Sequence, residues 1–136
     1  MTKEYWINLP IKDLKRSKKF FTEIGFTFNT TRETETMTSL VIGKAPMPIM
    51  FFEEKEFEKI VQSKIGDTSK GAEIIISFDA ESRNEIDEMA EKVRKAGGEV
   101  FSEPEELQGW MYNVAFKDLD GHRWNMLYMD MEKMPK

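Results

Sequence analysis

The sequence contains no cysteine and one histidine, His122, among its 136 residues. Without cysteine, the chain has no disulfide scaffold, no thiol nucleophile and no thiolate ligand for a metal ion. With one histidine, a single chain cannot build the multi-histidine sites that hold zinc or iron in many enzymes. A chain of this length folds without such crosslinks, because it can bury roughly two-thirds of the surface of its unfolded form.

Long uncharged runs are also missing. The longest, Leu107 to Phe116, has ten residues, whereas a helix that spans a membrane needs about 20. Met1 to Ile11 lacks the basic start, apolar run and small-residue cleavage site of a signal peptide. We therefore expect a cytoplasmic protein with no membrane partner.

The chain has no excess of positive charge. It contains 20 basic and 25 acidic residues and has a net charge of −5, whereas nucleic-acid-binding proteins usually present a basic face to phosphate groups. The densest basic stretch, Lys12 to Lys19, is typical of the solvated side of a helix. We expect no nucleic-acid partner.

The first half of the chain predicts a strand, a helix and three further strands. Apolar residues at every second position indicate a strand over residues 5–11. Asp13 can cap a following helix, whose apolar residues recur at spacings of three and four up to Ile24, and Gly25 can end it. Further strands are predicted over residues 26–30, 37–42 and 46–52.

The second half predicts the same order of elements. A short linking helix over residues 53–65 and a glycine-containing linker over 66–71 separate the two halves. A strand over 73–78 is followed by a capping box, Ser82 to Glu85, which opens a helix that runs to Ala96. The spacing of its apolar residues predicts that Ile86, Met89, Ala90, Val93 and Ala96 point inward. The remaining strands are predicted over residues 99–102, 110–116 and 122–129.

This repeated order predicts an α+β fold of two βαβββ modules, about residues 3–56 and 72–131, within a single domain over residues 1–136. Two such modules can pair as incomplete barrels around a cavity. The helices would then cover the convex faces of the sheets, and the concave faces would enclose the cavity.

Two segments carry a resemblance to a known family. One is Tyr5 to Leu14 with Phe20-Phe21 and Gly25-Phe26 after it, and the other is Phe116 to Asn125 with its Asp-Leu-Asp-Gly turn. Together they resemble the glyoxalase/bleomycin-resistance/extradiol-dioxygenase (vicinal oxygen chelate) superfamily over nearly the whole chain. The resemblance implies the fold but not one function, because the superfamily includes isomerases, dioxygenases, epimerases, thiol transferases and drug-binding proteins.

The resemblance also implies four positions for metal ligands, which family enzymes fill with histidine, glutamate or glutamine. In this sequence they fall on Trp6, Met50, Glu73 and Asn125. Only Glu73 is a good ligand, because tryptophan and methionine offer nothing to a hard divalent ion and an amide oxygen is a weak donor. We therefore expect no metal ion and no cofactor.

Strand alternation places a set of side chains on the cavity side, opposite the apolar residues that face the helices. Among them Glu73 is the candidate catalytic residue, because burial beside Trp6 would make it a proton carrier or a partner for a cation. Arg123 could instead reach Glu73 and form a structural ion pair. The predicted ligand-binding residues are Trp6, Asn8, Met50, Phe52, Glu73, Trp110 and Asn125.

Three functions fit such a pocket. The first is binding of a small apolar or cationic organic molecule in a metal-free cavity. The second is catalysis, either by a metal-dependent lyase or dioxygenase with an altered ligand set or by metal-free proton transfer through Glu73. The third is a structural homodimer whose own side chains fill the cavity.

A homodimer is also expected for the ligand-binding protein. Family members commonly pair their modules between chains, and half-closed sheets leave edges that a second chain can cover.

His122 is a weak candidate for a general base, because it directly follows a turn and its register places it on the opposite side of the strand from Asn125.

Overall fold

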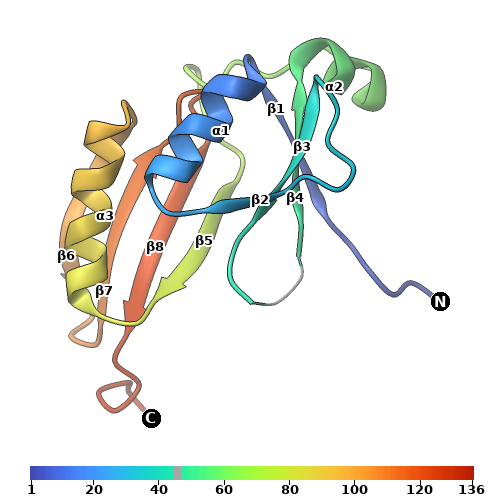
Figure 1. The fold of residues 1–136 in the computed structure, drawn as a ribbon. Helices are drawn as coiled ribbons and strands as arrows, with labels where there is room; N and C mark the ends of the chain where they lie inside the picture. The colour runs from blue at the N-terminus through green and yellow to red at the C-terminus, as the bar shows by residue number, and fades with distance from the viewer. Residues whose placement is uncertain (45–46) are drawn as a thin grey trace. The chain divides into compact units, whose positions relative to one another are not determined.

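The computed structural model describes residues 1–44 and 47–136 of the chain. These residues form two compact units, Met1–Asp67 and Thr68–Lys136, and each is described by itself (Figure 1). None of the helices in the described ranges combines the length and the hydrophobicity that a membrane crossing requires.

The first unit contains a four-stranded sheet and two helices. Its strands are β1 (Ile7–Ile11), β2 (Thr27–Asn29), β3 (Met37–Val41) and β4 (Ile49–Glu53), and its helices are α1 (Leu14–Glu23) and α2 (Glu54–Val61). The strand order is β1-β4-β3-β2, in which β1 runs parallel to β4 and the other pairs are antiparallel. A parallel pair requires a crossover connection, and α1 with the β2-β3 hairpin supplies it.

Helix α1 packs on the sheet of the first unit because its apolar residues fall on one side. Asp13 caps its start by accepting a hydrogen bond from the Arg16 backbone N–H at 3.1 Å. Phe21 is buried and packs against Phe51 of β4, with ring centroids 5.3 Å apart. Beyond the helix, Gly25 adopts a φ of +106°, a conformation that glycine reaches without strain.

The second unit repeats this arrangement. Its elements are β5 (Ile75–Ala80), α3 (Arg83–Lys95), β6 (Glu99–Leu107), β7 (Met111–Lys117) and β8 (Arg123–Met129). The strand order is β5-β8-β7-β6, with β5 parallel to β8 and the other pairs antiparallel.

Helix α3 begins as the sequence predicts. Ser82 Oγ accepts a hydrogen bond from the Glu85 backbone N–H at 3.2 Å, and Glu85 Oε2 accepts one from the Glu81 N–H at 2.7 Å. Ala96, which was expected to point inward, lies at the C-cap and is half-buried. The other residues predicted to point inward are buried, namely Ile86, Met89, Ala90 and Val93.

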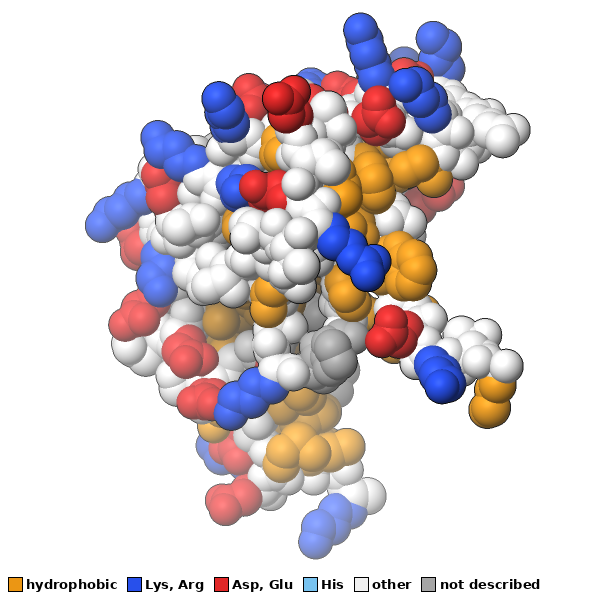
Figure 2. Space-filling model, turned by 45° about the vertical axis from the view of Figure 1, so that its right-hand side comes forward, with side chains coloured by type: hydrophobic (Ala, Val, Ile, Leu, Met, Phe, Trp, Pro, Cys, Tyr) orange, Lys and Arg blue, Asp and Glu red, His pale blue; other side chains and the backbone are white. Residues whose placement is uncertain are grey.

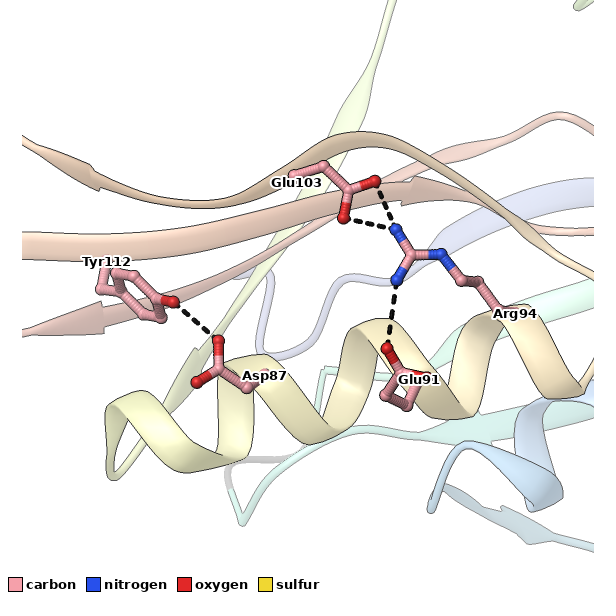
Figure 3. Close-up of polar contacts among 5 residues, drawn as sticks. All are labelled: Asp87, Glu91, Arg94, Glu103 and Tyr112. Atoms are coloured by element: carbon pink, nitrogen blue, oxygen red, sulfur yellow. Dashed lines mark hydrogen bonds and ion pairs between the residues drawn. The ribbon is translucent and has the colours of Figure 1, made fainter.

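Polar side chains also tie α3 to strands β6 and β7 (Figure 3). Tyr112 of β7 donates a hydrogen bond to Asp87 Oδ1 at 2.6 Å, which raises the pKa of Tyr112 because ionisation would remove the donor. Arg94 forms ion pairs with Glu91 of α3 and with Glu103 of β6. These contacts lie at the surface, where each ion pair adds little stability.

The two units confirm the predicted α+β fold of two βαβββ modules. Each unit has a four-stranded mixed sheet with the same pattern of connections, and α2 is the predicted linking helix. Over residues 1–44 and 47–136, neither sheet closes into a barrel. The pairing of the modules around a shared cavity stays a prediction.

Several predicted boundaries are wrong. Strand β1 begins at Ile7 and not at residue 5, and β5 begins at Ile75 and not at residue 73. Helix α2 ends at Val61 and not at residue 65. The predicted start of the fourth strand, Pro46, lies outside the described residues.

Strand β6 differs most from its prediction, since it runs to Leu107 and not to residue 102. It is an edge strand, and its pairing with β7 shifts register twice, between Val100 and Ser102 and between Ser102 and Glu105. Such bulges on an edge strand accommodate a proline, here Pro104, which cannot donate a ladder hydrogen bond.

Charged side chains of both signs are spread over the surface. Figure 2 shows basic and acidic side chains next to one another on the visible face. Lys18 pairs with Glu33 at 2.7 Å in the first unit, and Lys117 pairs with Glu99 at 3.3 Å in the second.

The basic residues around α1 are exposed except for Lys18, which is half-buried. This placement confirms the predicted solvated side of the helix.

Candidate functional site

Along each strand of the second sheet, successive side chains alternate between the face that α3 covers and the opposite face. Ile76, Val114, Phe116 and Trp124 are buried on the side of α3. The residues that alternate with them form a surface that we call the α3-free face. Its members on β5, β7 and β8 are Ile75, Ser77, Asp79, Met111, Asn113, Ala115, Lys117, Arg123, Asn125, Leu127 and Met129.

Three polar side chains are hydrogen-bonded in a row across the α3-free face. Asn125 of β8 lies opposite Ser77 of β5, and its Nδ2 donates a hydrogen bond to Ser77 Oγ at 3.3 Å. Asn125 Oδ1 accepts one from Asn113 Nδ2 of β7 at 2.7 Å. Asn113 Oδ1 is buried and has no partner among the described residues. Because buried polar atoms nearly always have a partner, this oxygen marks a place for a water molecule or a ligand group.

Arg123 lies two residues before Asn125 on the same face. Its guanidinium carbon is 4.5 Å from the centroid of the Phe101 ring on β6, a stacking that holds the side chain in place. Its Nε is buried without a hydrogen-bond partner, and no carboxylate of the described residues pairs with the guanidinium. Lys117, opposite Arg123 on β7, is paired with Glu99 at 3.3 Å. The α3-free face therefore carries a positive charge that no neighbouring acid neutralises.

The turn before β8 is organised by a buried carboxylate. Asp118 Oδ1 accepts hydrogen bonds from the backbone N–H groups of Asp120 at 2.9 Å and His122 at 3.0 Å. Asp118 Oδ2 accepts one from the indole N–H of Trp124 at 3.0 Å. Burial raises the pKa of Asp118, because the charged form is poorly solvated there. These bonds fix the start of β8 and therefore the positions of Arg123 and Asn125.

A second contact closes the same turn. Gly121 has a φ of +83°, and Thr68 Oγ1 donates a hydrogen bond to the Asp120 carbonyl oxygen at 2.8 Å. A Cβ atom at Gly121 would collide with the Thr68 hydroxyl. Both the backbone conformation and the close approach therefore require glycine at this position.

In the first unit, the predicted site residues share one face of the sheet, except for Trp6. Asn8 lies opposite Met50, and Phe52 lies opposite Pro10. Asn8 Oδ1 is buried and has no partner among the described residues. Trp6 precedes β1 and is 55% exposed, so the strand does not fix its side chain.

In the second unit, the structure separates the predicted residues. Asn125 lies within the hydrogen-bonded row, as described. Glu73 is exposed and precedes β5 by two residues, so it is not the first residue of an apolar strand. Trp110 lies in the turn between β6 and β7, half-buried, with an indole nitrogen that is buried and has no partner among the described residues.

In the sequence, strand alternation already places Ser77 on the cavity side, but reasoning from the sequence missed Asn113 and Arg123 as site residues. Asn113 bonds to Asn125, and Arg123 lies opposite Ile75, two positions before Asn125 on β8. Strand alternation gave a signal for Arg123, because it precedes Asn125 by two positions on the same strand. The alternative, an ion pair between Arg123 and Glu73, does not form among the described residues, and the Arg123 guanidinium stacks on Phe101.

The residues at the four family ligand positions do not fit a divalent metal ion. Trp6 and Met50 have no hard donor atom, and Asn125 Oδ1 already accepts a hydrogen bond from Asn113. Glu73 is the one carboxylate at these positions. In the described part of the chain, no group of three or more histidine, aspartate or glutamate side chains is placed to hold a metal ion.

Comparisons with known proteins agree with this fold. The sequence profile of the glyoxalase/bleomycin resistance protein/dioxygenase superfamily matches residues 5–126. A solved structure of a hypothetical protein, SA1046, from S. aureus is 34% identical, with a TM-score of 0.85 over 94% of this chain and 95% of that one.

Two further structures are similar in fold at lower identity. A glyoxalase/bleomycin resistance protein/dioxygenase family enzyme from Burkholderia phytofirmans PsJN has 18% identity and a TM-score of 0.78, over 91% of this chain and 96% of that one. The fosfomycin resistance protein FosX from Listeria monocytogenes has 22% identity and a TM-score of 0.68, over 97% of both chains. No curated protein matches the sequence. The chain belongs to the glyoxalase/bleomycin resistance protein/dioxygenase superfamily.

Proposed function

We propose that the chain binds a small organic molecule, and that the α3-free face of its second sheet is part of the binding site. The observation that carries the proposal is the row of Ser77, Asn125 and Asn113, which is joined by hydrogen bonds and leaves one buried amide oxygen without a partner. A few polar groups among apolar side chains are typical of small-molecule sites, where they fix the orientation of the ligand.

The first sheet supplies residues of the same kind to this proposal. Met50 and Phe52 are half-buried and lie on the face that α1 does not cover, beside the unpartnered amide oxygen of Asn8. A thioether and an aromatic ring adapt to varied apolar ligands. Trp6 and Trp110 complete the predicted ligand-binding set, which we retain as a proposal together with the homodimer.

We propose that this binding uses no metal ion at the family's four ligand positions. The support is chemical, because the donors there are an indole, a thioether, an amide and one carboxylate. The preference for a cationic ligand rests on the acidic balance of the chain and on a Glu73 inside an aromatic pocket, whereas the structure has Glu73 exposed. We therefore retain a small, partly apolar organic ligand and drop the cationic preference. Nothing in the geometry favours catalysis through Glu73.

A thermal-shift screen of chelator-treated protein against small organic molecules tests the proposal. A ligand that binds the native state raises the melting temperature. We expect Asn125→Leu to lose most of the ligand-induced shift, because it removes the centre of the hydrogen-bonded row. Asn84→Leu is the matched control, since Asn84 is exposed on α3 and its side chain bonds to Glu88 of the same helix.

Two results would overturn the proposed function. One is a screen in which no organic molecule shifts the melting temperature of the chelator-treated wild type. The other is a ligand-induced shift that Asn125→Leu and Asn84→Leu retain equally, which would place the site elsewhere on the chain.

A further inference from the structure

We propose that the ligand is a small organic anion, whose charged group lies between Arg123 and Ser77 and whose apolar part lies on Ile75. This inference rests on the proposed function and adds the chemical class of the ligand. The three residues are neighbours, because Ile75 lies directly opposite Arg123 and Ser77 lies opposite Asn125, two positions along.

The charge of Arg123 is the first reason. Arginine is always charged, and its planar guanidinium suits the two oxygens of a carboxylate or the oxygens of a phosphate. Here the described residues give Arg123 an aromatic ring and no acid. An anion from outside the chain would therefore gain a strong partner at little cost in ordering the side chain, which Phe101 already holds.

The hydroxyl of Ser77 is the second reason. Its oxygen accepts the hydrogen bond from Asn125 Nδ2, so its own proton is available to another acceptor. Ser77 is exposed, and it lies one strand across and two residues along from Arg123, a separation of roughly 8 Å between Cα atoms. Arg123 and Ser77 therefore offer donors to one group, and donors alone select an acceptor, that is, an anion.

The exposure of Ile75 is the third reason. Its side chain is 48% exposed at the start of the edge strand β5, next to Ile74 at 46%. Apolar surface beside an isolated charge favours a ligand with an apolar body and one charged end over an inorganic ion. The ligand is therefore an organic acid with an aliphatic or aromatic part.

Other charges on the α3-free face do not cancel this site. Glu99 is paired with Lys117, so that pair adds no net charge to the row of Arg123. Asp79 and Glu105 lie level with Leu127 across the strands. Leu127 is four residues along β8 from Arg123, a distance of roughly 13 Å. At physiological ionic strength, charges at that separation are largely screened where solvent reaches them.

Four probes with similar aliphatic bodies test the inference, namely valerate, butyl phosphate, butylammonium and butanol. Binding is followed by calorimetry and by the side-chain amide NMR signals of Asn113 and Asn125. We expect at least one anion to bind and shift these signals. The cation and the alcohol should bind at least tenfold more weakly, and added salt should lower the affinity for the anion. The comparison of valerate with butyl phosphate decides between a carboxylate and a phosphate.

Three variants complete the test. Arg123→Gln should lower the affinity for the anion about tenfold or more, as expected for a hydrogen-bonded charge, and Ser77→Ala should lower it about fivefold. Arg32→Gln removes the same charge from an exposed turn of the first unit and should leave the affinity unchanged. Circular dichroism melting curves verify that each variant folds. If Arg123→Gln does not fold, the salt dependence of anion binding to the wild type still tests whether the ligand meets a positive charge.

The possible failures are distinguishable. If butylammonium or butanol binds as tightly as the anions and shifts the two amide signals, the inference is wrong while the proposed function stands. If an anion binds but its affinity is unchanged by salt and by Arg123→Gln, the charged group does not lie at Arg123. If none of the four probes binds even at high millimolar concentration, the inference is wrong, and the thermal-shift screen decides separately whether the proposed function stands.

Discussion

Replacing Asp118 tests whether its hydrogen bonds outweigh the cost of burying its charge. Asp118→Ala removes the acceptor of the Asp120 and His122 backbone N–H groups and of the Trp124 indole. The indole belongs to a fully buried side chain, and an unsatisfied buried donor costs about 1–3 kcal/mol. Each of the two turn hydrogen bonds adds about 1 kcal/mol, so the free energy of unfolding should fall by at most roughly 3–5 kcal/mol, because removal of the buried charge offsets part of the loss.

Asp118→Asn separates the hydrogen bonds from the charge. The amide oxygen can keep both hydrogen bonds to the turn, but the amide nitrogen would then face the indole N–H of Trp124, and two donors cannot bond each other. Removing a buried charge offsets part of this loss. At neutral pH we expect a net destabilisation of about 1–2 kcal/mol, smaller than that of Asp118→Ala.

The pH dependence gives an independent check of the same residue. Burial raises the pKa of Asp118 above its ordinary value of 3.8, so the folded state holds the proton more tightly than the unfolded state. Its contribution to stability is therefore complete below that value and is lost as the pH rises through the raised pKa. Asparagine does not titrate, so the cost of Asp118→Asn should be largest in acid and shrink toward neutral pH.

Urea unfolding followed by tryptophan fluorescence measures these differences. The control is Asp87→Asn, because Asp87 is exposed on α3 and accepts a hydrogen bond from Tyr112; we expect it to cost about 1 kcal/mol or less. If Asp118→Asn equals or exceeds the wild type in stability at neutral pH, the hydrogen bond to Trp124 does not outweigh the buried charge and the reasoning is refuted. A cost that grows with pH would contradict the raised pKa.

Three further outcomes test other parts of the structure. Gly121→Ala should cost roughly 1–3 kcal/mol because of its positive φ and the collision with Thr68, whereas Gly66→Ala, with nothing within 4 Å, should cost less; equal costs in urea unfolding would refute this. Elemental analysis should find no stoichiometric zinc, iron, nickel or manganese, and a tightly held ion that Glu73→Ala removes would show a metal centre. Light scattering should show a homodimer, and a monomer at tens of micromolar would argue against it. Trp6→Ala should lower the affinity for the ligand by more than it destabilises the fold, and a loss of stability alone would argue against its place in the site.

The fold was predictable because hydrophobic periodicity and helix caps are local signals. Asp13 and Ser82 cap two of the three helices that the sequence predicts, and the inward residues of α3 follow from their spacing. The ends of the strands were not local signals. The alternation of apolar residues continues back to Tyr5, but β1 begins at Ile7, because β4 begins opposite it at Ile49.

The candidate site was less predictable for the same reason. Glu73 precedes an apolar run, yet β5 pairs with β8 only from Ile75 onward, opposite Arg123, so Glu73 stays outside the sheet and exposed. The hydrogen bonds of Asn125 depend on which residues of two other strands lie beside it. Asn113 lies diagonally across from Asn125, and no pattern within β7 alone reveals that neighbour.

The parallel pairing of β5 with β8 has a consequence for the order of folding. Strand β8 is an inner strand that joins β5 on one side to the β6-β7 hairpin on the other. Until Arg123–Met129 has left the ribosome, β5 has no partner and the exposed edge of β7 is open. The first sheet needs only the chain up to Glu53 for the equivalent pairing. During synthesis, the N-terminal module can therefore form while the second is a hairpin and an unpaired strand, and β8 joins these parts in a single late step.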